Sequence, residues 1–256
     1  MKIPLLIILS LLVNFCVAQE NSDNKKLSFG YDYGESFPKG TFSKNDQSKL
    51  PLSRFTKQDT SKLNGYALKG VHFDLYVTYK IIRHVSIMAS VCGDQNAYAI
   101  NTLNSQFIQF SPPNTVAVTT GDNYYVVQYL IGPDINIPII HSFSIELKAL
   151  AGITTANYPS LTYIGLSPDA LYSFPKGNGF GYTIGTGLKY CVGKSKGLAL
   201  ALHLNVNYAI ANITYPNYSI TYYTPGNVYL SSSTYNAIKS MPLNILQVTF
   251  GIALEL

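Results

Sequence analysis

His72 and Asp74 stand two residues apart, so both side chains share one face if this segment is a strand. A histidine beside a carboxylate can serve as the general base for a serine nucleophile, as in a hydrolytic triad. The sequence places no serine beside the pair. It contains no Gly-x-Ser-x-Gly elbow, no Walker A loop, no dinucleotide fingerprint and no Cys-x-x-Cys pair. We therefore expect a protein that is not an enzyme.

The other histidines and cysteines do not form an obvious ligand set. His203 falls on a segment well separated from that of His72, and the remaining two histidines stand in predicted turns. Cys92 and Cys191 are too few for a disulfide scaffold, and we expect both to be free thiols. We expect no resident metal ion, no cofactor and no nucleic-acid partner.

Strands are the elements that must position these residues. Eight segments show alternation of apolar side chains with small or polar ones, which is typical of two-faced strands. In the clearest, residues 198–210, Leu, Val, Tyr and Ile occupy one face, and Ala, His and Asn occupy the other. The predicted strands are 27–34, 71–81, 85–91, 124–136, 143–154, 180–192, 198–210 and 246–256.

The connections between these strands alternate between short and long. Short links fall at 83–84, 138–142 and 193–197, and long ones at 37–64, 101–123, 159–178 and 216–242. Transmembrane barrels have this pattern, whereas four long structureless loops would be unusual in a soluble sandwich. Charged residues make up only 12% of the chain, against about 25% in soluble proteins. The sequence therefore predicts an all-β fold, an eight-stranded antiparallel up-and-down transmembrane β-barrel. A soluble secreted β-protein is the alternative.

The N-terminus has the pattern of an export signal. Lys2 precedes an apolar run, and Ala18 supplies a small residue at the cleavage position, so we interpret residues 1–19 as a signal peptide. Residues 20–26 form a short polar leader, expected in the periplasm, and residues 27–256 form the barrel domain.

With the strands placed, the chain resembles the outer membrane β-barrel family, the small eight-stranded bacterial barrels built like the transmembrane domain of outer membrane protein A. The resemblance rests on the signal peptide, the two-faced strands, the alternating connections and a strand at the C-terminus. It implies location in the cell outer membrane, insertion by the assembly machinery, periplasmic termini and four surface loops. It implies no single activity. Such barrels commonly end in an aromatic residue, and this chain ends in Leu256.

An eight-stranded barrel is narrow enough for side chains to fill its interior, so a broad pore is not expected. Charged groups on the inward rows should pair, because an unpaired buried charge is costly. We predict an internal polar network. A narrow polar conduit is the alternative use of the same residues. The network's predicted members are His72, Asp74, Lys80, Glu146, Lys148, Lys189, His203 and Glu255.

Two of the long loops have a composition suited to contacts. The first is basic, with Lys44, Lys49 and Arg54, and could contact phosphates of lipopolysaccharide. The fourth is rich in tyrosine, including Tyr222 and Tyr223, which could contact a partner or form an aromatic girdle. We expect a monomer with a structural or surface-interaction role. A narrow channel for small solutes is the alternative, followed by an outer-membrane lipid-modifying enzyme.

Overall fold

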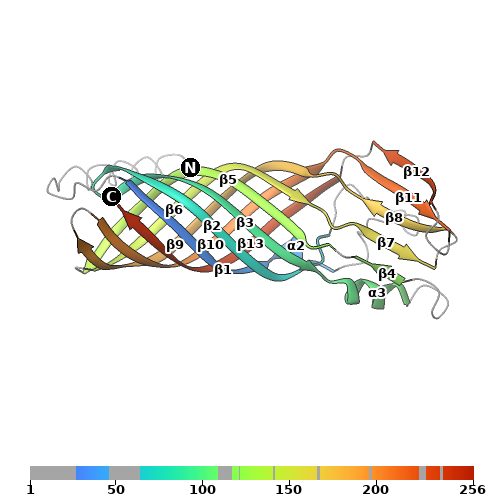
Figure 1. Ribbon diagram of the computed structural model, residues 1–256, viewed down its shortest axis with the longest axis horizontal. Helices are drawn as coiled ribbons and strands as arrows, with labels where there is room; N and C mark the ends of the chain where they lie inside the picture. Colours follow the sequence, from blue (N-terminus) through green and yellow to red (C-terminus); the bar gives the residue numbers. More distant parts are fainter. Residues whose placement is uncertain are drawn as a thin grey trace, which may run out of the picture.

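The computed structural model describes residues 27–45, 64–108, 117–120, 122–140, 142–165, 168–195, 198–224, 229–236 and 239–256. The predicted signal peptide and leader lie outside these ranges. Eight strands close into a barrel in the ring order β1-β13-β10-β9-β6-β5-β3-β2, and every neighbouring pair is antiparallel (Figure 1). Their bounds are Leu27–Pro38 (β1), Ala67–Ile82 (β2), Val85–Tyr98 (β3), Tyr124–Ile140 (β5), Phe143–Asn157 (β6), Gly177–Ser195 (β9), Leu198–Tyr215 (β10) and Lys239–Glu255 (β13).

All eight predicted strands are confirmed, and so is the closed antiparallel fold. Each strand joins the next along the chain as its neighbour in the ring, and β1 closes the ring against β13. Closure leaves no unpaired sheet edge, which is the condition for a β-structure to cross hydrocarbon. Among the described residues, no helix is long and apolar enough to span a bilayer.

The outer surface of the barrel is apolar. Half or more of the surface of Leu75 on β2, Ile131 on β5 and Leu204 on β10 is exposed, and similar side chains cover the neighbouring strands. A soluble monomer rarely exposes an apolar patch larger than a few hundred Å². Phe143 packs against Tyr190 with ring centroids 4.6 Å apart, at the end of the barrel that carries the short turns. This surface fits a lipid environment with aromatic rings near an interface.

Toward the other end of the barrel, the polarity of the wall inverts. On β10 the outward row is apolar from Leu198 to Ile210, but its next members are Asn212 and Thr214. Over the same stretch the inward row changes from His and Asn to buried Ile213 and Tyr215. β13 inverts in the same way. The strands therefore continue beyond the lipid-facing band with an apolar inside and a polar outside, as in a soluble β-protein.

The long connections contain secondary structure that the sequence pattern did not predict. They form two helices, Gly40–Ser43 (α2) and Ile100–Ile108 (α3), and a second, five-stranded sheet in the order β12-β11-β8-β7-β4. This loop sheet extends beyond one end of the barrel (Figure 1). Its strands are Ala117–Thr119 (β4), Leu161–Ile164 (β7), Asp169–Ser173 (β8), Tyr218–Tyr223 (β11) and Tyr229–Tyr235 (β12).

A cluster of buried aromatic and aliphatic side chains joins the loop sheet to the barrel. We call it the aromatic cap. Tyr158 lies at its centre, with its ring 5.5 Å from that of Tyr124 and 4.8 Å from that of Phe174. Burial raises the pKa of Tyr158 to about 12. The cap consists mainly of Phe42, Tyr66, Tyr98, Leu103, Val118, Tyr124, Tyr158, Leu161, Tyr163, Tyr172, Phe174, Ile213, Tyr215, Ile220, Met241, Leu243 and Ile245.

Candidate functional site

The barrel interior below the aromatic cap is lined with polar side chains. The alternation of the strands turns every second residue inward, and these positions carry Asp, Glu, His, Lys, Asn, Gln, Ser and Thr. His72, Asp74, Glu146, Lys148 and His203 are buried there. Lys80, Lys189 and Glu255 are only partly buried, nearer the short turns. All eight residues of the predicted network therefore lie on the interior side of the wall.

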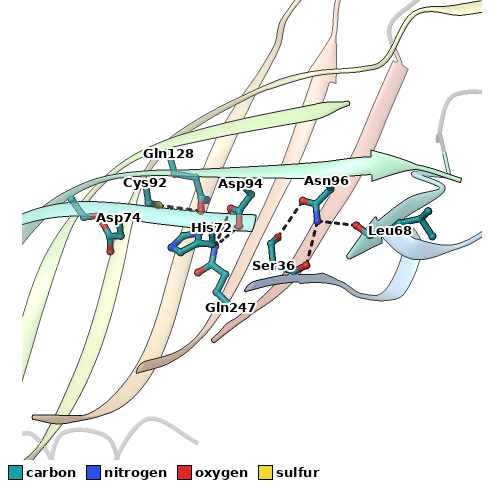
Figure 2. A network of polar contacts seen from close by, with 10 residues as sticks. Ser36, Leu68, His72, Asp74, Cys92, Asp94, Asn96, Gln128 and Gln247 are labelled. Carbon is teal, nitrogen blue, oxygen red and sulfur yellow. Dashed lines mark hydrogen bonds and ion pairs between the residues drawn. The ribbon is translucent and has the colours of Figure 1, made fainter. Parts of the chain in front are cut away.

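The upper part of this interior, nearest the cap, is centred on Asp94 (Figure 2). Nδ1 of His72 lies 2.9 Å from Oδ1 of Asp94, its register partner across β2 and β3. Nε2 of Gln247 donates to both carboxylate oxygens of Asp94, at 3.2 and 3.0 Å. Closer to the cap, the hydroxyl of Ser36 donates to Oδ1 of Asn96 at 3.2 Å. These contacts link β1, β2, β3 and β13 across the interior.

The carboxylate beside His72 is therefore Asp94 and not Asp74. Oδ1 of Asp74 instead accepts a hydrogen bond of 2.5 Å from the hydroxyl of Ser90. The serine thus contacts one carboxylate and the histidine another. The parts of a triad are present, but they are not connected in the order Ser–His–Asp that general-base catalysis requires.

A second group of charges lies lower in the barrel and is centred on Glu146. Nδ1 of His203 lies 2.8 Å from Oε2 of Glu146, and Nζ of Lys189 lies 3.7 Å from Oε1. Lys189 also forms an ion pair with Glu255. The four residues come from β6, β9, β10 and β13. This group clamps together the strands that carry the last two short turns and the C-terminus.

Besides Asp74, two members of the predicted network stand apart from these ion pairs. Nζ of Lys148 lies 5.9 Å from the ring centroid of Tyr76, a cation–π arrangement inside the barrel. Lys80 lies near the short turn between β2 and β3, on the wall of a cavity. The predicted residues therefore do not form one network. They are divided among the group around Asp94, the group around Glu146 and separate positions elsewhere in the interior.

Sequence reasoning missed three buried carboxylates of the described barrel interior. Asp32 accepts a hydrogen bond from Nδ2 of Asn205 at 2.7 Å, Asp94 binds His72, and Asp134 lies on β5. Asp94 falls three residues after the predicted end of its strand, and Asp134 stands in the strand whose alternation is least regular. Asp32 was on the polar face of the first predicted strand, and the alternation of polar and apolar residues there would have identified it as facing inward.

The thiols and histidines do not combine into a metal site among the described residues. Cys92 and Cys191 are both free, as predicted, and Sγ of Cys92 lies 3.7 Å from Oε1 of Gln128. His84 lies in a short turn, where Nδ1 contacts the carbonyl oxygen of Asn136 at 3.0 Å.

The predicted loop contacts are only partly described. Lys44 is exposed at the end of α2, whereas Lys49 and Arg54 lie outside the described residues. Tyr222 and Tyr223 are on β11, half-buried. Tyr222 packs against the aromatic cap, so part of its surface contributes to the fold.

One end of the barrel interior is filled by side chains, whereas the other end contains an open cavity. At the loop end, the cap fills the interior with side chains such as Tyr158, Leu161 and Tyr163, each 2% exposed or less. At the opposite end, a cavity of about 270 Å³ is lined by turn residues such as Arg83 and His84 and by polar residues of the interior. The described interior is thus a blind recess, open on the side of the short turns.

Comparisons with known proteins return small membrane barrels. No protein-family model and no curated protein sequence matches the chain. Among solved structures, Neisserial surface protein A is 10% identical over 90% of this chain and 97% of that chain (TM-score 0.41). The attachment invasion locus protein Ail of Yersinia pestis is 10% identical over 90% and 99% (TM-score 0.39). The outer membrane protease OmpT of Escherichia coli is 10% identical over 93% and 99% (TM-score 0.49).

The chain's own strand number, ring order and surface identify its architecture. Eight antiparallel strands close without an edge, the outward rows are apolar, and the inward rows are polar below the cap. The chain therefore has the architecture of a small outer-membrane β-barrel, as its sequence pattern indicated.

Proposed function

We propose that this protein is a non-enzymatic barrel of the cell outer membrane that holds the loop sheet at the cell surface for interaction with other molecules. The aromatic cap is the observation that carries the proposal. It fixes the loop sheet rigidly to the barrel and fills the passage between them. The short turns and both termini would then lie in the periplasm, and exposed Lys44 would face the lipid head groups.

The composition of the loop sheet supports a recognition role. All seven residues of β12, Tyr229 to Tyr235, are exposed, and none is charged. Tyrosine and serine together are typical of binding surfaces, because tyrosine supplies contact area at a low cost in conformational entropy. Buried charged groups such as Asp74, Asp94 and Glu146 instead lie in the barrel beneath the cap, away from this surface.

The alternative of a narrow channel has less support. A conduit needs a continuous polar path, and in the described structure the path ends at side chains of the cap with 0–8% exposure. Reconstituted in planar bilayers, the full chain should give no conductance above that of protein-free bilayers. Regular single-channel steps would refute the non-conducting part of the proposal.

Cysteine labelling on intact cells tests the display of the sheet. In a background with both native thiols of the barrel replaced by serine, Ser232→Cys on β12 should react with a membrane-impermeant maleimide. Arg83→Cys, in the short turn, should react only after the outer membrane is permeabilised. The reverse result would place the loop sheet on the periplasmic side.

Recognition itself is tested by retention of whole cells on an array of purified glycans and proteins. Cells that display the full chain should be retained on at least one surface, and the double variant Tyr229→Ser, Tyr235→Ser should lose that retention. Both rings are exposed, so this variant should keep its barrel. Retention no better than that of cells without the protein would leave only a structural role.

A further inference from the structure

The blind recess at the short-turn end contains two charged groups that the ion-pair networks do not use. Lys80 and Asp134 both line its wall. Among the described residues, the ammonium group of Lys80 forms no ion pair or hydrogen bond, and Oδ1 of buried Asp134 accepts no hydrogen bond. Of the other charged residues that line this cavity, Glu146, Lys189 and Glu255 pair with one another, and Arg83 lies in the short turn.

The strand register places these two groups on one line across the wall. Lys80 on β2 is opposite Ser86 on β3, and Ser86 is opposite Asp134 on β5. Adjacent strands are about 4.8 Å apart, so the two backbones lie roughly 10 Å from each other. All three residues line the cavity. The positive charge of Lys80 and the negative charge of Asp134 therefore line the same cavity, and the hydroxyl of Ser86 comes from the strand between them.

Across β5 and β6, the register partner of Asp134 is Lys148, whose Nζ lies 5.9 Å from the ring centroid of Tyr76. Unpartnered polar atoms also belong to other residues of the recess. Oδ1 of Asn136, two residues along β5, is also buried without a partner, as are the hydroxyl of Tyr76 and Nε2 of His203. These three residues line the same cavity. An ammonium group has donors and no acceptor, so it complements the carboxylate and amide oxygens at this position. A carboxylate would in turn complement Lys80, nearer the turn.

The size of the recess limits the ligand to a small molecule. A volume of about 270 Å³ corresponds to roughly nine water molecules at ~30 Å³ each. That is enough for a molecule of amino-acid size, and too little for a folded peptide or a sugar chain.

We propose that this recess binds a small free zwitterion, with its ammonium group at Asp134 and Asn136 and its carboxylate at Lys80. The site opens on the side opposite to the loop sheet, so it does not depend on the surface-interaction role. The ligand would be taken from the compartment that the short turns face, and the cap above would keep it from passing through the barrel.

Calorimetric titration of the detergent-solubilised full chain tests the proposal, with 4-aminobutanoate as the probe. Butanoate and butylamine, which each carry one of its two charges, are the comparison ligands. The titrations are run at mildly alkaline pH so that the carboxyl groups are ionised. We expect 4-aminobutanoate to bind at least about tenfold more tightly than either comparison ligand, equivalent to about 1.4 kcal/mol. Equal weak binding of all three would overturn the proposal, because it would show a water-filled recess without recognition.

Two variants assign the ends of the ligand. Lys80→Met should remove the preference for 4-aminobutanoate over butylamine, and Asp134→Asn should remove its preference over butanoate. Lys69→Met is the matched control, because Lys69 is exposed near the loop end and paired with Glu35 at 2.5 Å. Heat-modifiable gel mobility verifies that each variant is folded. An unchanged preference in both folded variants would overturn the assignment.

A measurement on the protein without substitutions does not depend on whether a variant folds. The probe should slow acetylation of Lys80 by a water-soluble amine reagent, read by mass spectrometry, and leave acetylation of Lys69 unchanged. Protection by trialanine but not by 4-aminobutanoate would instead indicate the end groups of a peptide, and would refute a compact zwitterion as the ligand.

Discussion

Leu202→Arg is the substitution that most directly tests the lipid-facing surface. Leu202 lies on the outward row of β10, opposite Ile252 and Tyr190 of the neighbouring strands. From Leu198 to Ile210 the row runs for 12 residue steps. At ~3.4 Å per residue and a strand tilt of about 40°, this spans roughly 31 Å along the membrane normal. Leu202 is then about 5 Å from the middle of the apolar band.

An arginine near the bilayer midplane of a β-barrel costs about 2–4 kcal/mol. With a urea dependence of about 2 kcal/mol per molar, the unfolding midpoint should fall by about 1–2 M. The measurement is a urea titration of the chain folded into lipid vesicles, followed by tyrosine fluorescence and gel mobility.

Thr214→Arg is the matched control for this prediction. Thr214 belongs to the same outward row of β10, but it lies beyond the point where the polarity of the wall inverts, and it is exposed. A charge should therefore remain in water there, and the expected change is within about 0.5 kcal/mol. Equal losses for both variants, or no loss for Leu202→Arg, would show that the outward row does not contact lipid.

Three further predictions concern the interior and the cap. Leu161→Ala, at a fully buried position in the cap, should destabilise the loop sheet by about 2–5 kcal/mol and speed its proteolysis, while exposed Leu230→Ala should not. Gly251→Ala should lower the free energy of unfolding, measured by urea titration, by about 1–3 kcal/mol, because a Cβ there would lie 1.8 Å from a buried carboxylate oxygen of β1; Gly193→Ala, with open space, should be neutral. The raised pKa of Tyr158 stabilises the cap below pH ~10, and this contribution should be lost as pH rises toward about 12. Between these pH values, the free energy of unfolding of Tyr158→Phe should therefore fall less with rising pH than that of the unsubstituted protein. An identical pH dependence of the two proteins would refute the stabilising role of Tyr158.

The sequence predicted the barrel strands well because one physical constraint governs them. Wherever one face meets lipid, apolar side chains must recur at every second position, as they do from Leu198 to Ile210. The ends of the strands were predicted too short for the same reason. After Ile210 on β10 and before Leu246 on β13, the apolar side chains lie on the inward face instead of the outward face. A prediction that requires apolar residues on the outward face therefore ends each strand at this point.

The loop sheet was missed because its strands carry no such pattern. β12 reads Tyr-Leu-Ser-Ser-Ser-Thr-Tyr, with every residue exposed, and β4 and β7 have only three and four residues. Parity along a strand predicts which way a side chain faces. It does not predict which residues meet across the interior, because this depends on the stagger between strands. His72 therefore pairs with Asp94, which local sequence spacing could not reveal.

The continuity of the strands has a mechanical consequence. The hairpin β11–β12 is the direct extension of β10 and β13, which pair with each other over 17 residues from Ala199–Glu255 to Tyr215–Lys239. Tension applied to the hairpin along the barrel axis would pull both strands lengthwise past β9 and β1. Many wall hydrogen bonds would then bear the load at once, instead of breaking one after another. Such a geometry resists a force directed along the strands better than a force that would peel one strand from its neighbour.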